Sequence, residues 1–201
     1  STDRGLCGPY NTNLFRYIET RLQEVNLNSQ SLVFITVGRK GSVYLAKTGR
    51  NLQADFPGFP DRFTYPDTLS LSQIAIQGFT KGEFKEVWIA SMYFVNTLSQ
   101  QPTLIRILPI SHIFGDIKPQ ESVSSSLYLF EPSTQSILDW LLPYYVELQI
   151  YQSLLNALAS EHSARMVTMK NAHDSAEDIT STLTLEYNRA RQSKITGELL
   201  D

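Results

Sequence analysis

The last third of the chain is the feature that most limits its possible folds. Residues 144–201 contain no proline, and Gly197 is their first glycine. This pattern is typical of one uninterrupted helix, because proline and glycine are the residues that most often end helices. As a continuous helix, these residues would span about 87 Å. That length exceeds the diameter of a 201-residue domain, so most of the helix must project.

A projecting helix still has to cover its apolar stripe. The stripe recurs at the spacings of three and four residues that coiled coils use, and it comprises Met169, Ala172, Ala176, Ile179, Leu183, Tyr187 and Ala190. Its alanines let a partner helix approach closely but bury little apolar area. No other segment of this chain is long enough to be the partner. We therefore expect a second copy, or a segment outside the given sequence, to cover the stripe.

The sequence also indicates where this helical region begins. Ser133 is the predicted N-cap, and the apolar stripe begins at Ile137. Pro143 is expected to kink or restart the helix, since a proline inside a helix removes one backbone hydrogen bond. We therefore divide the chain into a globular domain, residues 1–132, and a long helix, residues 133–201.

The globular region alternates between two periodicities. Helical spacing or helix-ending signals predict helices over 14–25, 39–49 and 69–78. Continuous apolar, β-branched runs predict strands over 31–38, 84–96, 102–110 and 126–132. Two loops are expected between these elements, over 51–67 and 111–126. Strands alternating with helices favour an α/β layer fold with a partly parallel sheet.

Composition excludes several classes of protein. The net charge of −3 argues against nucleic acid as a bulk electrostatic partner. No apolar run reaches the roughly 18–20 residues that a membrane-spanning helix needs. Cys7 is the only cysteine, so an intrachain disulfide and a cysteine-based zinc site are excluded.

No pattern of catalytic residues stands out. The stretch "GLCGPYN" lacks the G-x-G-x-x-G spacing, and Pro9 has no N–H, so a structural turn is the favoured interpretation. His162 and His173 would lie about 16 Å apart on the helix, too far to share a metal ion. His112 falls in a predicted loop. We therefore expect no catalytic residue, no cofactor and no metal.

Three blocks of the sequence resemble one known family. The blocks "SEHSARMVTMKNAHDSAEDI" and "LTLEYNRARQSKITGEL" closely resemble the C-terminal helix of the gamma subunit of F-type ATP synthases. The opening "STDRGLCGPYNTNL" is similar to the motif after the first strand of that subunit's globular domain, and "EPSTQSILDWLLPYYVELQIYQSLLNALASEHSARM" adds a third block in the same order. The resemblance runs from end to end.

The resemblance implies a central rotor shaft standing on a Rossmann-like domain. In the family, a long N-terminal helix and the C-terminal helix form an antiparallel coiled coil inside a ring of alpha and beta subunits. The domain rests on the epsilon subunit and the membrane ring of c subunits. This sequence begins after the family's N-terminal helix and first strand and stops at "GELLD". We therefore expect the N-terminal helix of a longer subunit to cover the alanine-rich stripe.

The resemblance also implies roles for particular residues. The positions that match a contact with a beta-subunit loop, often called a catch, are Arg191, Gln192 and Thr196. The positions expected to couple rotation to catalysis are Arg165, Met169, Asn188 and Arg189. The family's place is peripheral, on the inner side of a bacterial plasma membrane, mitochondrial inner membrane or thylakoid. The subunit itself is expected to do no bond chemistry.

Two other functions compete with this interpretation. A standalone α/β adaptor that dimerises through its C-terminal helix predicts a stable homodimer of the chain as given. An enzyme with a Rossmann-like pocket needs a cofactor motif and convergent titratable groups, and we find neither in the sequence.

Overall fold

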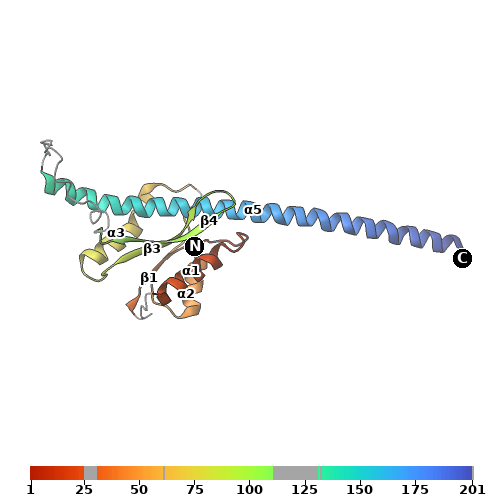
Figure 1. The fold of residues 1–201 in the computed structure, drawn as a ribbon, viewed down its shortest axis with the longest axis horizontal. Helices are drawn as coiled ribbons and strands as arrows, with labels where there is room; N and C mark the ends of the chain where they lie inside the picture. Colours follow the sequence, from red (N-terminus) through yellow and green to blue (C-terminus); the bar gives the residue numbers. More distant parts are fainter. Residues whose placement is uncertain (25–30, 61, 111–130, 132, 201) are drawn as a thin grey trace.

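A single helix runs along the whole molecule and organises the fold. The computed structural model describes residues 1–24, 31–60, 62–110, 131 and 133–200. Its helix α5, Thr134–Leu200, has 67 residues, or about 100 Å of helix. The globular body lies along the first half of α5, and the second half projects away from it (Figure 1). The prediction of a long projecting C-terminal helix is confirmed.

The first turn of α5 is capped as expected. The Ser133 hydroxyl oxygen accepts a hydrogen bond from the Ser136 N–H at 3.2 Å, which confirms Ser133 as the N-cap. Pro143 lies inside α5 and does not divide it. The expectation that the helix would restart there was therefore wrong, because the turns after Pro143, with the buried Val146 and Ile150, pack against the body and hold the helix together across the missing hydrogen bond.

The body contains three further α-helices, one short 3₁₀ helix and four strands in its described part. In chain order these elements are α1 (Tyr10–Glu24), β1 (Phe34–Val37), α2 (Arg39–Thr48), β2 (Leu52–Phe56), η2 (Tyr65–Thr68), α3 (Leu69–Thr80), β3 (Val87–Phe94) and β4 (Gln100–Leu108). Strands β1 and β2 pair in parallel through the crossover helix α2, and β3 pairs with β4 as an antiparallel hairpin. The described strands thus form two separate pairs rather than one sheet.

Most predicted elements are present, with shifted ends. Helix α1 begins at Tyr10, four residues before the predicted start, and residue 25 lies outside the described residues. The predicted loop over 51–67 contains strand β2, which we missed because Gln53 and Asp55 are poor strand formers. The predicted loop over 111–126 lies wholly outside the described residues, and so does the predicted strand over 126–132 apart from residue 131.

Two apolar clusters form the core, and α5 contributes to both. The first cluster joins α3, β4 and α5, and its buried members are Ala75, Ile107, Leu108, Val146 and Ile150. The second joins the N-terminal turn, α1 and β3, and its buried members are Cys7, Tyr10, Leu14 and Met92, with Ala164 of α5 packed against them. The body is therefore built directly on the first half of α5.

Aromatic and polar contacts supplement this packing near the start of α5. The Tyr65 hydroxyl donates a hydrogen bond to the Glu147 carboxylate, which raises the pKa of Tyr65 to about 12. The rings of Phe63 and Tyr151 meet edge to face with centroids 5.7 Å apart. The segment before α3 is thereby fixed against α5.

Substituting Ile150 tests how far the body depends on α5. Ile150 is 4% exposed, so Ile150→Ala is expected to lower the free energy of unfolding by about 2–5 kcal/mol through lost burial and the cavity left behind. Leu155, on the same helix, is 40% exposed, and Leu155→Ala is expected to cost about 1 kcal/mol or less. Urea unfolding of both variants measures the difference. Equal losses would contradict the packing described here.

Candidate functional site

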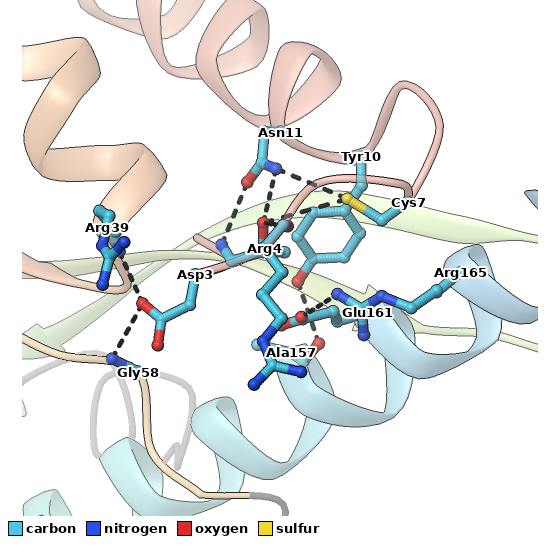
Figure 2. Close-up of polar contacts among 11 residues, drawn as sticks. Asp3, Arg4, Cys7, Tyr10, Asn11, Arg39, Gly58, Ala157, Glu161 and Arg165 are labelled. Carbon is cyan, nitrogen blue, oxygen red and sulfur yellow. Dashed lines mark hydrogen bonds and ion pairs between the residues drawn. The ribbon is translucent and has the colours of Figure 1, made fainter.

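The N-terminal turn is held by a network around Asn11. The Asn11 side-chain oxygen accepts from the Thr2 N–H at 3.1 Å, and its amide nitrogen donates to the Thr2 hydroxyl at 2.8 Å and to Cys7 Sγ at 3.6 Å. Leu6 and Gly8 both have positive φ, so the backbone reverses tightly between these contacts. Figure 2 shows the network. The stretch "GLCGPYN" is thus a turn, as expected.

Asp3 joins this turn to two other segments. Its Oδ1 accepts hydrogen bonds from the Arg39 N–H at 2.8 Å, at the start of α2, and from the Gly58 N–H at 3.1 Å (Figure 2). A Cβ at position 58 would lie 2.4 Å from the Asp3 carboxylate, so a larger residue there would displace that carboxylate from its two N–H donors. A carboxylate at a helix N-terminus is also electrostatically favourable. The first N–H of α2 therefore already has a partner from within the chain.

The turn contacts α5 where that helix leaves the body. The Tyr10 hydroxyl donates to the Ala157 carbonyl at 3.0 Å, and the Ser160 hydroxyl donates to the Met92 carbonyl at 3.4 Å. Burial raises the pKa of Tyr10, and the nearby negative charge of Glu161 raises it further. We call this region, residues 7–10, Met92 and residues 157–168, the exit collar. Tyr10 and Ala157 are 147 positions apart in sequence, so no local pattern indicated their contact.

Arg165 belongs to the exit collar. Its Nη2 lies 2.5 Å from Glu161 Oε1 on the preceding turn, and its side chain is 26% exposed (Figure 2). The resemblance groups Arg165 with residues near Arg191 in one coupling role. Along the helix, these two positions are about 39 Å apart. The structure thus places Arg165 and Met169 about one helical turn apart and separates both from Asn188 and Arg189.

Beyond the collar, α5 is exposed along the whole of its described length. Every residue from 169 to 200 is exposed. The large members of the predicted stripe are no exception, and their exposed fractions are 38% for Met169, 60% for Ile179, 57% for Leu183 and 67% for Tyr187. No described residue covers the alanine-rich stripe.

The predicted catch residues lie on this exposed half. The Thr196 hydroxyl donates to the Gln192 carbonyl at 2.8 Å, so its proton is used within the helix. The Lys194 Nζ atom lies 3.8 Å from Glu198 Oε1, one turn further along the helix. The guanidinium groups of Arg189 and Arg191 have no ion pair with any residue that the structure describes. Their donors are therefore available to a partner.

The stripe and most of the polar residues occupy opposite sides of the helix. At about 100° per residue, the apolar stripe forms one narrow arc. Asn188, Arg189, Gln192 and Thr196 project from the opposite side, and Arg191 projects between the two. The exposed half of α5 therefore presents an apolar face and a polar face that can bind different partners at the same time.

A recess of about 280 Å³ lies beside the collar, among Cys7, Tyr10, Met92, Leu98 and Thr168. None of the side chains lining it is charged. Within the described part of the chain, no group of three or more His, Cys, Asp or Glu side chains is placed to hold a metal ion. The same part contains no helix long and apolar enough to cross a membrane.

Comparisons with known sequences agree with one another. The sequence pattern of the family described as "ATP synthase" matches residues 1–201. The "ATP synthase gamma chain" of Herpetosiphon aurantiacus is 37% identical over 203 residues, covering 98% of this chain and 67% of that protein. The gamma chain of Roseiflexus sp. strain RS-1 is 39% identical over 198 residues, covering 98% of this chain and 66% of that protein. The chain thus spans about two thirds of the length of these relatives.

Solved structures show the same fold. A chain of the Tetrahymena thermophila mitochondrial ATP synthase central stalk and c-ring matches with a TM-score of 0.63 and 24% identity, over 86% of this chain and 73% of that chain. A chain of the Euglena gracilis mitochondrial ATP synthase rotor matches with a TM-score of 0.67 and 18% identity, over 97% and 72%. At these identities the likeness concerns the fold.

Substituting Asn11 tests the network of the N-terminal turn. Asn11→Ala removes two hydrogen bonds to Thr2 and one to Cys7, and Thr2 is fully buried. We expect a loss of about 1–3 kcal/mol in the free energy of unfolding, because the buried Thr2 N–H loses its acceptor and the Thr2 hydroxyl and Cys7 sulfur lose a donor. Asn13 is the matched control on the same helix, since its side chain makes no hydrogen bond within the described residues. Chemical denaturation should separate the two variants, and a similar loss for Asn13→Ala would refute the network's role.

Proposed function

The chain belongs to the ATP synthase gamma chain family, and on that premise we propose that it is the central-stalk rotor subunit of an F-type ATP synthase. In this role it couples proton translocation through the membrane sector to ATP synthesis or hydrolysis in the alpha–beta catalytic ring by rotating. Residues 1–132 form the foot and residues 133–201 form the shaft, the first part of which packs into the foot.

One observation carries the proposal. Half of α5 projects from the body with every residue exposed, and it carries two arginines, Arg189 and Arg191, that form no ion pair with any described residue. An isolated helix of this kind has little tertiary packing to stabilise it, so it is suited to being enclosed by other subunits. A central position inside a catalytic ring supplies such surroundings.

The mechanism requires unequal contacts with the three catalytic sites. A ligand or partner shifts a conformational equilibrium only by as much as its affinity for the two states differs. In this proposal Arg191, Gln192 and Thr196 face one beta subunit at a time. An arginine fork binds a carboxylate or backbone carbonyls with a defined direction, and a glutamine both donates and accepts. Each rotational step therefore favours a different conformation in each beta subunit.

The foot supplies the other partners in this proposal. It contacts the epsilon subunit and the membrane ring of c subunits, and the subunit is peripheral on the inner side of an energy-transducing membrane. Arg165, Met169, Asn188 and Arg189 contribute to coupling along the shaft. The subunit is non-catalytic by itself, and the bond chemistry takes place in the ring. The alternative of a standalone adaptor is not supported by the relatives, which are ATP synthase gamma chains.

Rotation can be tested directly in the assembled complex. The complete subunit, with a probe on a cysteine introduced at the exposed Lys47 of α2, would be assembled with alpha and beta subunits fixed to a surface. We expect ATP to drive stepwise rotation of the probe in one direction. An assembled, ATP-hydrolysing complex whose probe stays still would overturn the proposed function.

The role of Arg191 and Gln192 can be tested by measuring how tightly proton pumping is coupled to ATP hydrolysis. A hydrogen bond to a charged group contributes about 1.5–3 kcal/mol, so Arg191→Ala is expected to weaken the contact with the ring about 10–100-fold. We expect both Arg191→Ala and Gln192→Ala to reduce the protons pumped per ATP hydrolysed in membrane vesicles. Arg16→Ala, at an exposed position of α1, is the matched control and should change nothing. Unchanged pumping per ATP in both shaft variants would rule out the catch.

A further inference from the structure

Torque that α5 carries between body and shaft must pass through the place where α5 becomes exposed. Thr168 is the last half-buried residue before the exposed half begins. Behind it, the body holds α5 through apolar packing, with Val146 and Ile150 as the most buried apolar side chains of the helix. Apolar burial is non-directional. It therefore opposes separation of α5 from the body more than it opposes rotation of α5 about its own axis. Hydrogen bonds depend on angle and restrain rotation.

Tyr10 provides one such restraint. It is 3% exposed, and its hydroxyl donates to the Ala157 carbonyl at 3.0 Å. The tyrosine is the first residue of α1, so it links that helix to α5. Figure 2 shows the ring reaching from the turn to the helix backbone. The bond is made to the helix backbone itself, and rotation of α5 about its axis would move the acceptor away.

Ser160 provides a second restraint, and its hydroxyl behaves unlike those around it. Seven other hydroxyls of α5 donate to the carbonyl four residues back in the same helix; they belong to Ser153, Thr168, Ser175, Thr180, Thr182, Thr184 and Thr196. Ser160 is fully buried and donates instead to Met92 of β3. The residue opposite Met92 in β4 is Pro102, which has no N–H to donate. Ser160 therefore links α5 directly to the backbone of β3.

The turn itself is shaped to reach α5. Gly8 has φ +58°, and a Cβ on it would lie 3.0 Å from the Thr168 hydroxyl oxygen. The backbone of the turn thus comes within side-chain contact of the last half-buried residue of α5. The restraints from Tyr10, Ser160 and the turn all fall within residues 157–168.

We propose that the exit collar is a torsional clamp, in which Tyr10 and Ser160 act as positioning residues that stop α5 from turning within the foot. The proposal rests on the proposed rotor function. It assigns these two side chains no contact with the catalytic ring. They act through the backbone of α5, by keeping the shaft and the body at the same rotational angle about the axis of α5.

The experiment measures how tightly the body follows the shaft. In the surface-fixed complex with the probe at position 47, the angular variance of the probe during pauses between steps is inversely related to the torsional stiffness of the connection. We expect Tyr10→Phe and Ser160→Ala each to raise this variance, and the double variant to raise it further. ATP hydrolysis without an opposing load should keep its wild-type rate.

Tyr44→Phe is the matched control. It also removes one tyrosine hydroxyl hydrogen bond, donated to Glu19 at 2.8 Å, but this bond joins α2 to α1 and does not involve α5. We expect Tyr44→Phe to leave the variance unchanged.

The results that would refute the clamp differ from the result that would refute the rotor function. If the wild-type probe rotates and both collar variants keep the wild-type variance, the clamp is refuted while the rotor function stands. An equal rise in Tyr44→Phe would also refute the clamp, because the effect would then reflect general loosening of the body. If the wild-type probe does not rotate, the proposed function itself fails.

Discussion

The unbroken backbone hydrogen-bond ladder of α5 is the constraint on which the rest of the structure depends. Each N–H along 67 residues bonds within the helix, apart from the ends and Pro143, so body and projection share one rigid element. The two core clusters are arranged along its first half, and Val146, Ile150 and Ala164 supply the surface on which they form. A break in this ladder would separate the projection from the core that fixes its direction.

Periodicity made most of this architecture predictable. The absence of proline from residues 144–201, and of glycine before Gly197, predicted the long helix, and apolar runs predicted β1, β3 and β4. Strand β2 was not predicted, because only three of its five residues, Leu52, Ala54 and Phe56, are apolar. Contacts between segments distant in sequence were not predicted at all. Nothing in the spacing of residues 7–10 indicated that Tyr10 would reach Ala157, since such a contact is decided by packing.

The candidate site was predictable only in part. Its location on the exposed half of α5 followed from helix length and the uncovered stripe, whereas the roles of Arg191, Gln192 and Thr196 came from resemblance and remain predictions. Asp3 and its glycine partner gave no sequence signal, because the close approach at Gly58 depends on two loops meeting. A glycine in a loop has many explanations, and the structure supplies the one that applies here.

The hydroxyl groups on the exposed half of α5 have a consequence for how that surface behaves beside a neighbour. Ser175, Thr180, Thr182 and Thr184 donate to carbonyls of their own helix, so their protons are already engaged. A neighbouring subunit that moves past them meets mainly methyl and methylene groups. It breaks few hydrogen bonds and leaves few polar groups unsatisfied as it moves. At these four positions α5 therefore resists sliding only weakly, in contrast to the arginines and glutamine nearer the tip, whose donors bind with a defined direction.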